Sequence, residues 1–493
     1  MTKSENNLQL ILKKATFYRL PFVLLLIRKL FRKHRYAIAF FLFGKSRIDD
    51  AIALYKSKSG LKFKHENEKL LFERLTAIEM GAKSSPLKSR SSDIKKGGKR
   101  ILMALHNSAP YDYAGYWFRT IGTLDALKKQ GYEIECCTRP GYPWDLIKHR
   151  DKPKRYSEKV EGFNFTRLVD KNKTFKKGSD QRYIDTYVNE LVLKAKQNNS
   201  QIIHAHSNFL NGLAAAKAAK SLGIRSVYEV RGLWHLTQAS KNNSYEHTIM
   251  FDYEWNKELE AMHEADRVVV LSDTMRELIV SKGVPNGKIT TIPNAVANDV
   301  FKYGEGNNTV QIHKVFHIGF IGTITHYEGL ELVIDAVKLL VKQNNLVELT
   351  IVGDGVHLES LKQYSKNLKY VRFIGRIPKE QVAKYYQQFD VCIYPRTNHL
   401  VCNYIPPMKI VEAMGYGCPV IVSDLLVMRE YVNHNETGLI CSLKEKDSLA
   451  LNILKIMEDP KLKAKLSKNA LNWVKENHNW DIVSRKYSNV FND

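Results

Sequence analysis

A short segment between two prolines and a glycine-containing turn carries a lysine and a glutamate that could act on one ligand. Pro406 and Pro407 open this segment and Gly417-Cys418-Pro419 closes it, which predicts a short helix before a buried strand. Lys409 and Glu412 are three residues apart and therefore share one helical face. A lysine in the first turn opposes the helix dipole by about 0.3–1 kcal/mol, so its placement favours a bound anion at the helix mouth. A carboxylate one turn later could accept hydrogen bonds from a vicinal diol, and phosphate plus diol describes a nucleotide; the alternative is a solvated ion pair on a surface helix.

The elements that must position this helix alternate along most of the chain. Apolar strand-like runs alternate with helix-like runs. The strand-like runs lie at residues 100–106, 132–138, 201–206 and 226–230, and the same alternation continues between about 315 and 423. This order predicts an α/β protein built from parallel sheets. The first run leads through a polar loop to Gly115 and a helix, which is how a Rossmann-like unit begins, but no GxGxxG fingerprint is present.

Three polar residues follow directly on predicted strands of the first half. His206 and Ser207 end one strand, and Arg231 ends the next. Ligands of open parallel sheets bind at the carboxyl ends of the strands, so we expect these residues near a binding cleft, with Arg231 and Ser207 in contact with an acceptor or a phosphate. The alternative for His204 and His206 is that they are strand-end histidines with backbone partners.

The bulk composition limits the class of protein. A chain of 493 residues is too long for one core. Its 76 basic and 51 acidic residues give a net charge of +25, and residues 1–100 alone hold 24 basic and 8 acidic residues. Charge gathered at one end predicts an anchor or tail rather than a nucleic-acid-binding domain. The six cysteines form no CxxC pair, which favours reduced thiols without a zinc site, and no cleavable signal sequence is recognisable.

The basic N-terminal region contains two apolar runs, at residues 20–27 and 36–44, with five cations between them. Both runs are far shorter than the roughly 20 residues that a spanning helix needs. Carrying the five cations through a bilayer would cost about 2.5–3.5 kcal/mol each. We therefore expect residues 1–98 to form a basic amphipathic extension on an anionic membrane surface, with residues 83–100 as a flexible linker. The alternative is that these runs pack as helices against the rest of the protein.

The segment from Pro407 to Val420 resembles the nucleotide-sugar site of the family 4 retaining GT-B glycosyltransferases, and the resemblance extends over about residues 100–490. It implies two Rossmann-like domains, at 99–310 and 311–475, that face an interdomain cleft, with a last helix at 476–493 crossing back to the first domain. It also implies transfer of a sugar from a nucleotide diphosphate to a hydroxyl of a glycan or lipid-linked acceptor, without a metal or another cofactor. Since members of this family commonly act there, we also expect a role in cell-envelope polysaccharide or lipopolysaccharide synthesis at the inner face of the membrane.

The resemblance also implies roles for individual residues. His206 would lie near the reacting carbon of the sugar, while Lys409 and Arg396 would stabilise the leaving diphosphate. Glu412 would hold the ribose diol. The residues implied in donor binding are Gly115, Gly322, Thr323, Gly375, Arg376, Ile377, Pro407, Met408 and Glu412.

The chain departs from the family pattern at three positions. Thr323 and Glu328 stand where many relatives have an arginine and a lysine, and no acid is found near Asn403 where the first glutamate of an acidic pair is usual. An acid at Glu328 cannot neutralise a diphosphate, so we expect Lys409 and Arg396 to replace the missing cations. Two alternatives remain open, a sugar-nucleotide epimerase of the same fold and a catalytically silent scaffold subunit.

Overall fold

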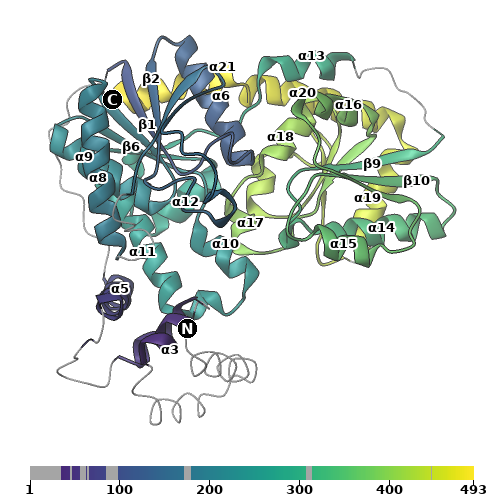
Figure 1. Cartoon of the computed structure of the whole chain (residues 1–493). Coiled ribbons are helices and arrows are strands. Elements are labelled where there is room, and N and C mark those ends of the chain that lie inside the picture. Colours follow the sequence, from purple (N-terminus) through teal and green to yellow (C-terminus); the bar gives the residue numbers. More distant parts are fainter. Residues whose placement is uncertain are drawn as a thin grey trace.

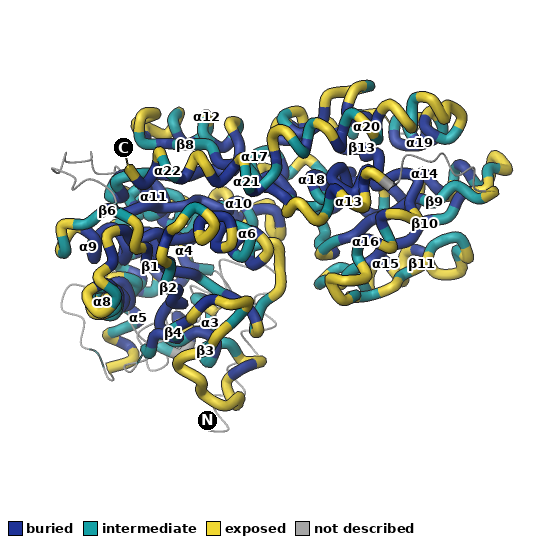
Figure 2. Tube along the Cα trace, turned by 90° about the horizontal axis from the view of Figure 1, so that it is seen from above, coloured by how far each residue is buried: buried dark blue, intermediate teal, exposed yellow. Residues whose placement is uncertain are grey.

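The computed structural model describes residues 35–44, 47–55, 63, 66–84, 98–170, 179–306, 314–445 and 447–492. The chain forms two α/β domains, and its C-terminal helices run from the second domain back onto the first (Figure 1). Most residues of both sheets are buried, and exposed residues gather on the outer turns of helices and on loops (Figure 2). The predicted fold class is therefore confirmed.

The first domain is built on a sheet that has eight strands within the described residues, in the order β3-β4-β2-β1-β5-β6-β7-β8. All neighbours pair in parallel except β3 and β4. The strands are β1 (Arg100–Leu105), β2 (Glu133–Thr138), β3 (Ser157–Val160), β4 (Phe163–Arg167), β5 (Ile202–His206), β6 (Arg225–Val230), β7 (Arg267–Val270) and β8 (Ile289–Thr291). Its helices include α6 (Gly115–Lys129), α8 (Asp180–Gln197), α9 (Phe209–Leu222), α10 (Trp234–Lys241), α11 (Ile249–Glu264) and α12 (Asp273–Ser281).

The second domain contains a fully parallel sheet with six described strands, in the order β11-β10-β9-β12-β13-β14. The strands are β9 (Phe316–Ile321), β10 (Val347–Val352), β11 (Val371–Gly375), β12 (Val391–Tyr394), β13 (Val420–Ser423) and β14 (Leu439–Cys441). The helical segments used below are η5 (His326–Glu328), α14 (Leu330–Lys342), α16 (Lys379–Gln388), α17 (Leu400–Tyr404), α18 (Met408–Gly415), η6 (Leu426–Glu430) and α19 (Ser448–Glu458). Parallel pairing with helices on both faces explains why these strands are continuous apolar runs.

The C-terminal helices complete the core of the first domain. After α20 (Pro460–Asn477), the chain forms α21 (Trp480–Val483) and α22 (Arg485–Asn492). Trp480 lies against α6, where a side chain at Gly122 would come within 2.1 Å of its ring. The carbonyl of Val490 accepts a hydrogen bond from Arg225 at 3.0 Å. These contacts attach the last helices to both α6 and β6.

The described part of the N-terminal region packs on the first domain. It forms α3 (Arg35–Gly44), α4 (Ile48–Ala53) and α5 (Glu66–Lys83). The helices α4 and α5 contact α11, and α3 packs on α4 (Figure 1). Their buried residues, which join the core of the domain, are Ile38, Ala39, Leu42, Ile48, Ala51, Ile52, Leu71, Leu75 and Ile78. Asn256 of α11 also donates to the carbonyls at the end of α5, to Gly81 at 3.0 Å and Ala82 at 2.9 Å.

These contacts correct the expectation for the second apolar run. Ile38, Ala39 and Leu42 of this run are buried in protein while Phe40 is 57% exposed, because one face of the helix that suits a membrane surface suits a helical partner equally well. The helices α3, α4 and α5 of the expected extension therefore pack as part of the first domain. The first run, residues 20–27, lies outside the described residues, as do residues 85–97 of the expected linker. In the part of the chain that the structure describes, no helix combines the length and apolar character needed to cross a bilayer.

A buried glutamate on α11 makes the stability of the first domain depend on pH. Glu258 accepts hydrogen bonds from the Phe209 amide at 3.0 Å and the Tyr228 hydroxyl at 2.5 Å, and burial raises its pKa to about 8. The folded protein thus binds a proton that the unfolded chain releases near pH 4.5, so we expect stability to fall as pH rises between about 5 and 8. Glu258→Gln should flatten this slope in urea titrations at several pH values. Glu260→Gln on the same helix serves as the control and should leave the slope unchanged.

Candidate functional site

The predicted short helix is α18, and its first turn holds Lys409. Pro407 is its N-terminal cap residue. The side chain of Lys409 is only 11% exposed, and its ammonium lies over the ring of Phe320 at 4.6 Å. The helix ends before Gly417, which has a φ of +73° and leads into β13. Lys409 is therefore held under the end of β9 rather than turned outward to water.

Lys409 belongs to a buried group of three charged side chains. Its Nζ lies 2.8 Å from Glu328 Oε2. Arg396 approaches the same carboxylate with two nitrogens, Nη2 at 3.0 Å from Oε1 and Nε at 3.3 Å from Oε2. A third nitrogen of Arg396, Nη1, donates to the carbonyl of Ile405 at 3.1 Å. We call Glu328, Arg396 and Lys409 the charged triad; it carries one net positive charge.

Two glycines make room for the charged triad. A side-chain carbon at Gly322 would come within 3.0 Å of Lys409 Cε. Gly329 has a φ of +71°, and a side-chain carbon there would lie 2.1 Å from the carbonyl oxygen of Pro395. The loop from β9 to α14 therefore needs glycine at both positions, because any side chain would displace Lys409 or push η5 away from the strand end that carries Arg396.

The opposite charges of the triad stabilise one another's ionised forms in a buried site. Burial would raise the pKa of Glu328, but the two cations Arg396 and Lys409 hold it below its usual range. Burial lowers the pKa of Lys409 to about 8, against the attraction of Glu328. The ammonium is therefore still mostly charged at pH 7. A carboxylate held ionised between two cations leaves a single positive charge to offer a ligand.

Glu412 lies one turn further along α18 and is half-buried. The Tyr386 hydroxyl donates to its Oε2 at 3.4 Å, and the Tyr386 ring stacks on that of Tyr416 at 4.8 Å. Burial raises the pKa of Glu412 to about 7. Glu412 and Lys409 thus lie in different surroundings, one among aromatic rings and one inside the charged triad.

The remaining donor-binding candidates lie in loops, at the end of β11 and in the first turns of α6 and α18. Gly375 ends β11 with a φ of +80°, and its carbonyl accepts from the Gly353 amide at 2.8 Å. The exposed ones are Thr323, Arg376 and Gly115, while Met408 and Ile377 are half-buried and Pro407 is buried. A side-chain carbon at Gly115 would meet nothing within 4 Å, so the start of α6 faces open space.

The first-domain candidates gather around a different carboxylate, that of Glu229 on β6. Fully buried, it is contacted by Arg231 Nε at 2.7 Å, Arg119 Nε at 2.8 Å, the Tyr487 hydroxyl at 2.7 Å and His204 Nε2 at 3.1 Å. His206 Nε2 lies 3.1 Å from Arg231 Nη2. Burial, aided by Arg231, lowers the pKa of His206 well below its usual range, so His206 is neutral at pH 7.

Arg231 and Ser207 make their hydrogen bonds within the first domain. Arg231 Nη1 donates to the Tyr116 carbonyl at 3.0 Å and to the Thr120 hydroxyl at 2.6 Å. Ser207 Oγ accepts from the Arg231 amide at 2.6 Å and donates to the Glu229 carbonyl at 3.3 Å. Both side chains are therefore engaged inside the domain, and a contact with an acceptor or a phosphate stays a prediction. The role of His206 beside a donor sugar stays a prediction.

The ligand atoms of His204, His206 and Glu229 are close enough together, within 4.8 Å, to raise the question of a metal site. Arg119 and Arg231 already lie against the carboxylate. A cation placed here would face two guanidinium groups and would have to displace them from Glu229. The surroundings therefore fit an internal ion-pair network and do not fit a metal.

The two domains meet next to α18. Asn294, after β8, donates to the carbonyl of Pro406 at 3.0 Å. The Ser272 hydroxyl donates to the carbonyl of Tyr404 at 3.2 Å. Glu430 on η6 accepts from the Thr274 amide at the start of α12 at 2.6 Å. The segment that leads into α18 therefore rests on the strand ends of the first domain.

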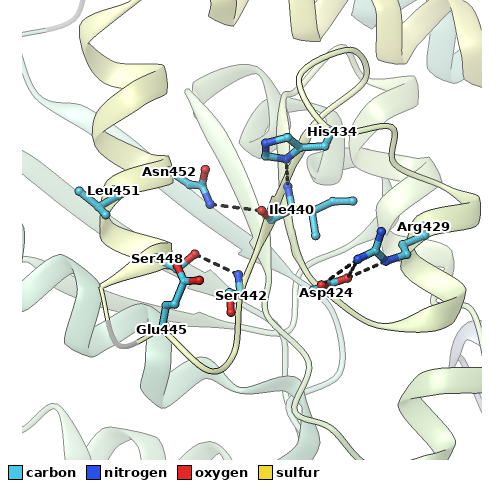
Figure 3. Close-up of a pocket in the computed structure, with 9 residues that line it drawn as sticks. All are labelled: Asp424, Arg429, His434, Ile440, Ser442, Glu445, Ser448, Leu451 and Asn452. Atoms are coloured by element: carbon cyan, nitrogen blue, oxygen red, sulfur yellow. Dashed lines mark hydrogen bonds and ion pairs between the residues drawn. The ribbon is translucent and has the colours of Figure 1, made fainter.

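A separate pocket of about 510 Å³ opens at the edge strand β14 of the second domain (Figure 3). It is lined by Asp424, Arg429, His434, Ile440, Ser442, Glu445, Ser448, Leu451 and Asn452. Its polar groups bond mainly to one another: His434 Nδ1 accepts from the Ile440 amide, Asn452 donates to the Ile440 carbonyl, and Ser448 accepts from the Ser442 amide. These side chains satisfy the exposed edge of the sheet, so the pocket carries a structural role.

Two family models match the chain in succession. The model described as Glycosyltransferase Family 4 matches residues 119–300, and the model described as Glycosyl transferases group 1 matches residues 308–473. The first match begins within α6, and the second ends within α20.

Curated relatives are similar over shorter stretches. An uncharacterized glycosyltransferase of Methanocaldococcus jannaschii is 24% identical over 46% of this chain and 60% of its own length. The amylovoran biosynthesis glycosyltransferase of Erwinia amylovora is 23% identical over 38% of this chain and 46% of its own. The phosphatidyl-myo-inositol mannosyltransferase of Mycolicibacterium smegmatis is 26% identical over 33% of this chain and 41% of its own. The chain thus spans 60% or less of the length of these relatives.

Solved structures are similar over most of the chain. Sucrose-phosphate synthase from Thermosynechococcus elongatus has a TM-score of 0.63 at 19% identity and covers 80% of this chain and 98% of its own. Anabaena HepE in complex with UDP-glucose has a TM-score of 0.58 at 16% identity and covers 79% of this chain and 98% of its own. These similarities show the fold. With the two successive matches to its domains, they establish that the chain belongs to the family 4 glycosyltransferases and has the GT-B fold.

Proposed function

We propose that the protein transfers a sugar from a nucleotide diphosphate donor to a hydroxyl of a glycan or lipid-linked acceptor, with retention and with no need for a metal or another cofactor. The observation that carries the proposal is the charged triad at the loop from β9 to α14, which contains Gly322 and Gly329. Lys409 of this triad lies in the first turn of α18. The Anabaena relative of known structure binds UDP and UDP-glucose, which supports a nucleotide sugar as donor.

The proposed chemistry follows from charge. Cleavage of the glycosyl bond leaves negative charge on the departing diphosphate, and preorganised cations stabilise such charge most effectively where water is excluded. Lys409 supplies this cation, with Arg396 behind it in the same triad. Glu412 accepts hydrogen bonds from the ribose diol. Neutral His206 orients the sugar, so that the acceptor hydroxyl attacks from the face that the diphosphate leaves.

The class of product is proposed from the names of relatives. One of them is an amylovoran biosynthesis enzyme, and another is encoded in a capsule region of Klebsiella pneumoniae. A lipopolysaccharide outer core galactosyltransferase shares the fold, with a TM-score of 0.56. We therefore propose assembly of a cell-envelope polysaccharide or lipopolysaccharide.

Incubation of the purified protein with a panel of UDP-, GDP- and ADP-sugars tests this function. Release of nucleoside diphosphate that rises on addition of a polysaccharide or lipid-linked glycan would support a transferase. Recovery of an epimerised donor without release would assign an epimerase instead. Failure to bind or turn over any donor would leave a scaffold role. Product anomeric configuration and activity in the presence of EDTA test retention and metal independence in the same assay.

We also propose that the N-terminal residues bring the enzyme to the inner face of the membrane. Residues 1–34 hold the apolar run 20–27 and eight basic residues, a composition suited to anionic headgroups. Removal of residues 1–34 is expected to abolish sedimentation with phosphatidylglycerol vesicles while leaving the melting temperature nearly unchanged, because α3, α4 and α5 stay in place. Vesicles of phosphatidylcholine provide the control, and equal binding by both forms of the protein would refute the anchor.

A further inference from the structure

We propose that Glu328 is a positioning residue for the transfer reaction: its carboxylate holds the Lys409 ammonium where the leaving diphosphate must arrive. This inference rests on the proposed function, since it concerns the same site. It concerns a residue whose type departs from the family pattern, because Glu328 stands where many relatives have a lysine. A carboxylate at this place cannot bind a diphosphate, so its buried position needs another explanation.

The geometry around Glu328 leaves its carboxylate no freedom. Only 2% of the residue is exposed, and three nitrogens approach its two oxygens within 3.3 Å. Arg396 fixes the plane of the carboxylate with two parallel contacts, because a guanidinium binds a carboxylate as a fork. Lys409 has a flexible side chain with a compact charge. Its ammonium therefore pairs with the fixed carboxylate of Glu328 in one defined position.

Arg396 is in turn anchored by its own surroundings. Its third nitrogen donates to the Ile405 carbonyl, and its guanidinium lies over the ring of Tyr327 at 5.5 Å. The Thr397 amide donates to the Tyr327 carbonyl at 3.0 Å. The end of β12 and η5 are thus tied together before α18 begins. Arg396 thus orients Glu328, and Glu328 orients Lys409, whose side chain lies beside Gly322.

Charge separates this role from a purely structural one. The triad carries a net charge of +1, and Glu328→Gln would raise it to +2 at a pH where Lys409 stays protonated. If Glu328 served only the fold or only weakened anion binding, the added charge would leave turnover intact or tighten the complex with a nucleoside diphosphate. If Glu328 positions Lys409, turnover should fall although the complex with the diphosphate does not weaken. Binding and turnover therefore move in different directions under this proposal.

The protonation of Lys409 supplies a second readout. The groups that face it are Glu328 on η5, Arg396 after β12, Cys402 on α17 and Glu412 on its own helix, with the rings of Phe320 and Tyr394. Glu328 is the carboxylate in direct contact with the ammonium. Its neutralisation should lower the pKa of Lys409 below about 8. The alkaline limb of the turnover profile should then move to lower pH.

The experiment compares Glu328→Gln, Glu328→Asp and the control Glu331→Gln, using the donor identified by the panel and UDP as the binding probe. Glu331 lies on α14 and pairs with His357. We expect Glu328→Gln to lower kcat at least tenfold, to leave the Kd for UDP unchanged or lower, and to shift the alkaline limb down. Glu328→Asp keeps the charge and should keep the alkaline limb of the parent protein while kcat falls less. Glu331→Gln should match the parent protein.

A double-substitution cycle with Lys409→Met completes the test. If Glu328 acts through Lys409, then Glu328→Gln should cause no further loss of kcat in the Lys409→Met background. If the losses of kcat in the two single variants multiply in the double variant, the proposal is overturned. A kcat and pH profile of Glu328→Gln that match the parent protein would also overturn it. Should Glu328→Gln not fold, an alkaline limb shifted in Glu328→Asp would overturn it instead. Absence of turnover in the parent protein would defeat the proposed function, a result distinct from all of these.

Discussion

Replacing Lys409 with alanine is expected to lower donor turnover about a hundredfold, the usual loss when one preorganised donor to a developing negative charge is removed. The substitution takes away the ammonium in the first turn of α18 and leaves Glu328 with Arg396 alone. The remaining pair has no net charge, so nothing in the triad would offset the charge of the leaving diphosphate. The measurement is the rate of nucleoside diphosphate release at saturating donor.

The control for this substitution is Lys384→Ala, which removes an exposed lysine from α16 in the same domain. It should retain the turnover of the parent protein. Both variants should also be checked by thermal unfolding, because Lys409 packs over the ring of Phe320. A Lys409→Ala protein that is folded and turns over donor at the parent rate would show that the diphosphate binds elsewhere.

Replacing Glu229 with alanine is expected to destabilise the protein by about 3–5 kcal/mol, the usual cost of breaking a buried ion pair by removing one partner. Arg119 and Arg231 would both lose their counter-charge in a site closed to water. The free energy of unfolding from urea titration measures the effect. Tyr487→Phe removes a single contact with the same carboxylate and should cost about 1 kcal/mol.

Glu133→Ala, at an exposed position at the start of β2, provides the comparison and should change stability little. A Glu229→Ala protein as stable as this control would mean that Arg119 and Arg231 find other partners, and the network would then have no role in holding the domain together. Equal destabilisation by Tyr487→Phe and Glu229→Ala would instead show that docking of α22, not charge, is the main contribution.

The sequence predicts the sheets and α18 well because both depend on local patterns. Continuous apolar runs identify buried parallel strands, and the proline and glycine boundaries of α18 fix its ends within a residue. The hairpin of β3 and β4 escapes prediction, since its strands are short and polar residues such as Ser157, Glu158 and Lys159 give no apolar period. Its turn at Glu161 and Gly162, both with positive φ, is the only local signal.

The candidate site is predicted less completely because its contacts join distant parts of the chain. The resemblance to the family identifies Glu328 as a departure, but not that it pairs with Arg396, 68 residues later. The network at Glu229 joins residues up to 368 positions apart, and no spacing rule covers such distances. For Arg231, a strand-end position suggested a free cation, whereas a carboxylate two residues earlier draws it inward. The signal available in the sequence was Glu229 itself, which lies on β6 two residues before Arg231.

The attachment of α21 and α22 to the first domain has a consequence for the order of events during synthesis. Trp480, Val483, Tyr487, Val490 and Phe491 share one apolar cluster with residues of β1 and α6. A ribosome has therefore translated the whole second domain before the cluster has all its members. Until then the nascent first half keeps an unfilled face, and fragments cut near residue 310 should require chaperones or aggregate.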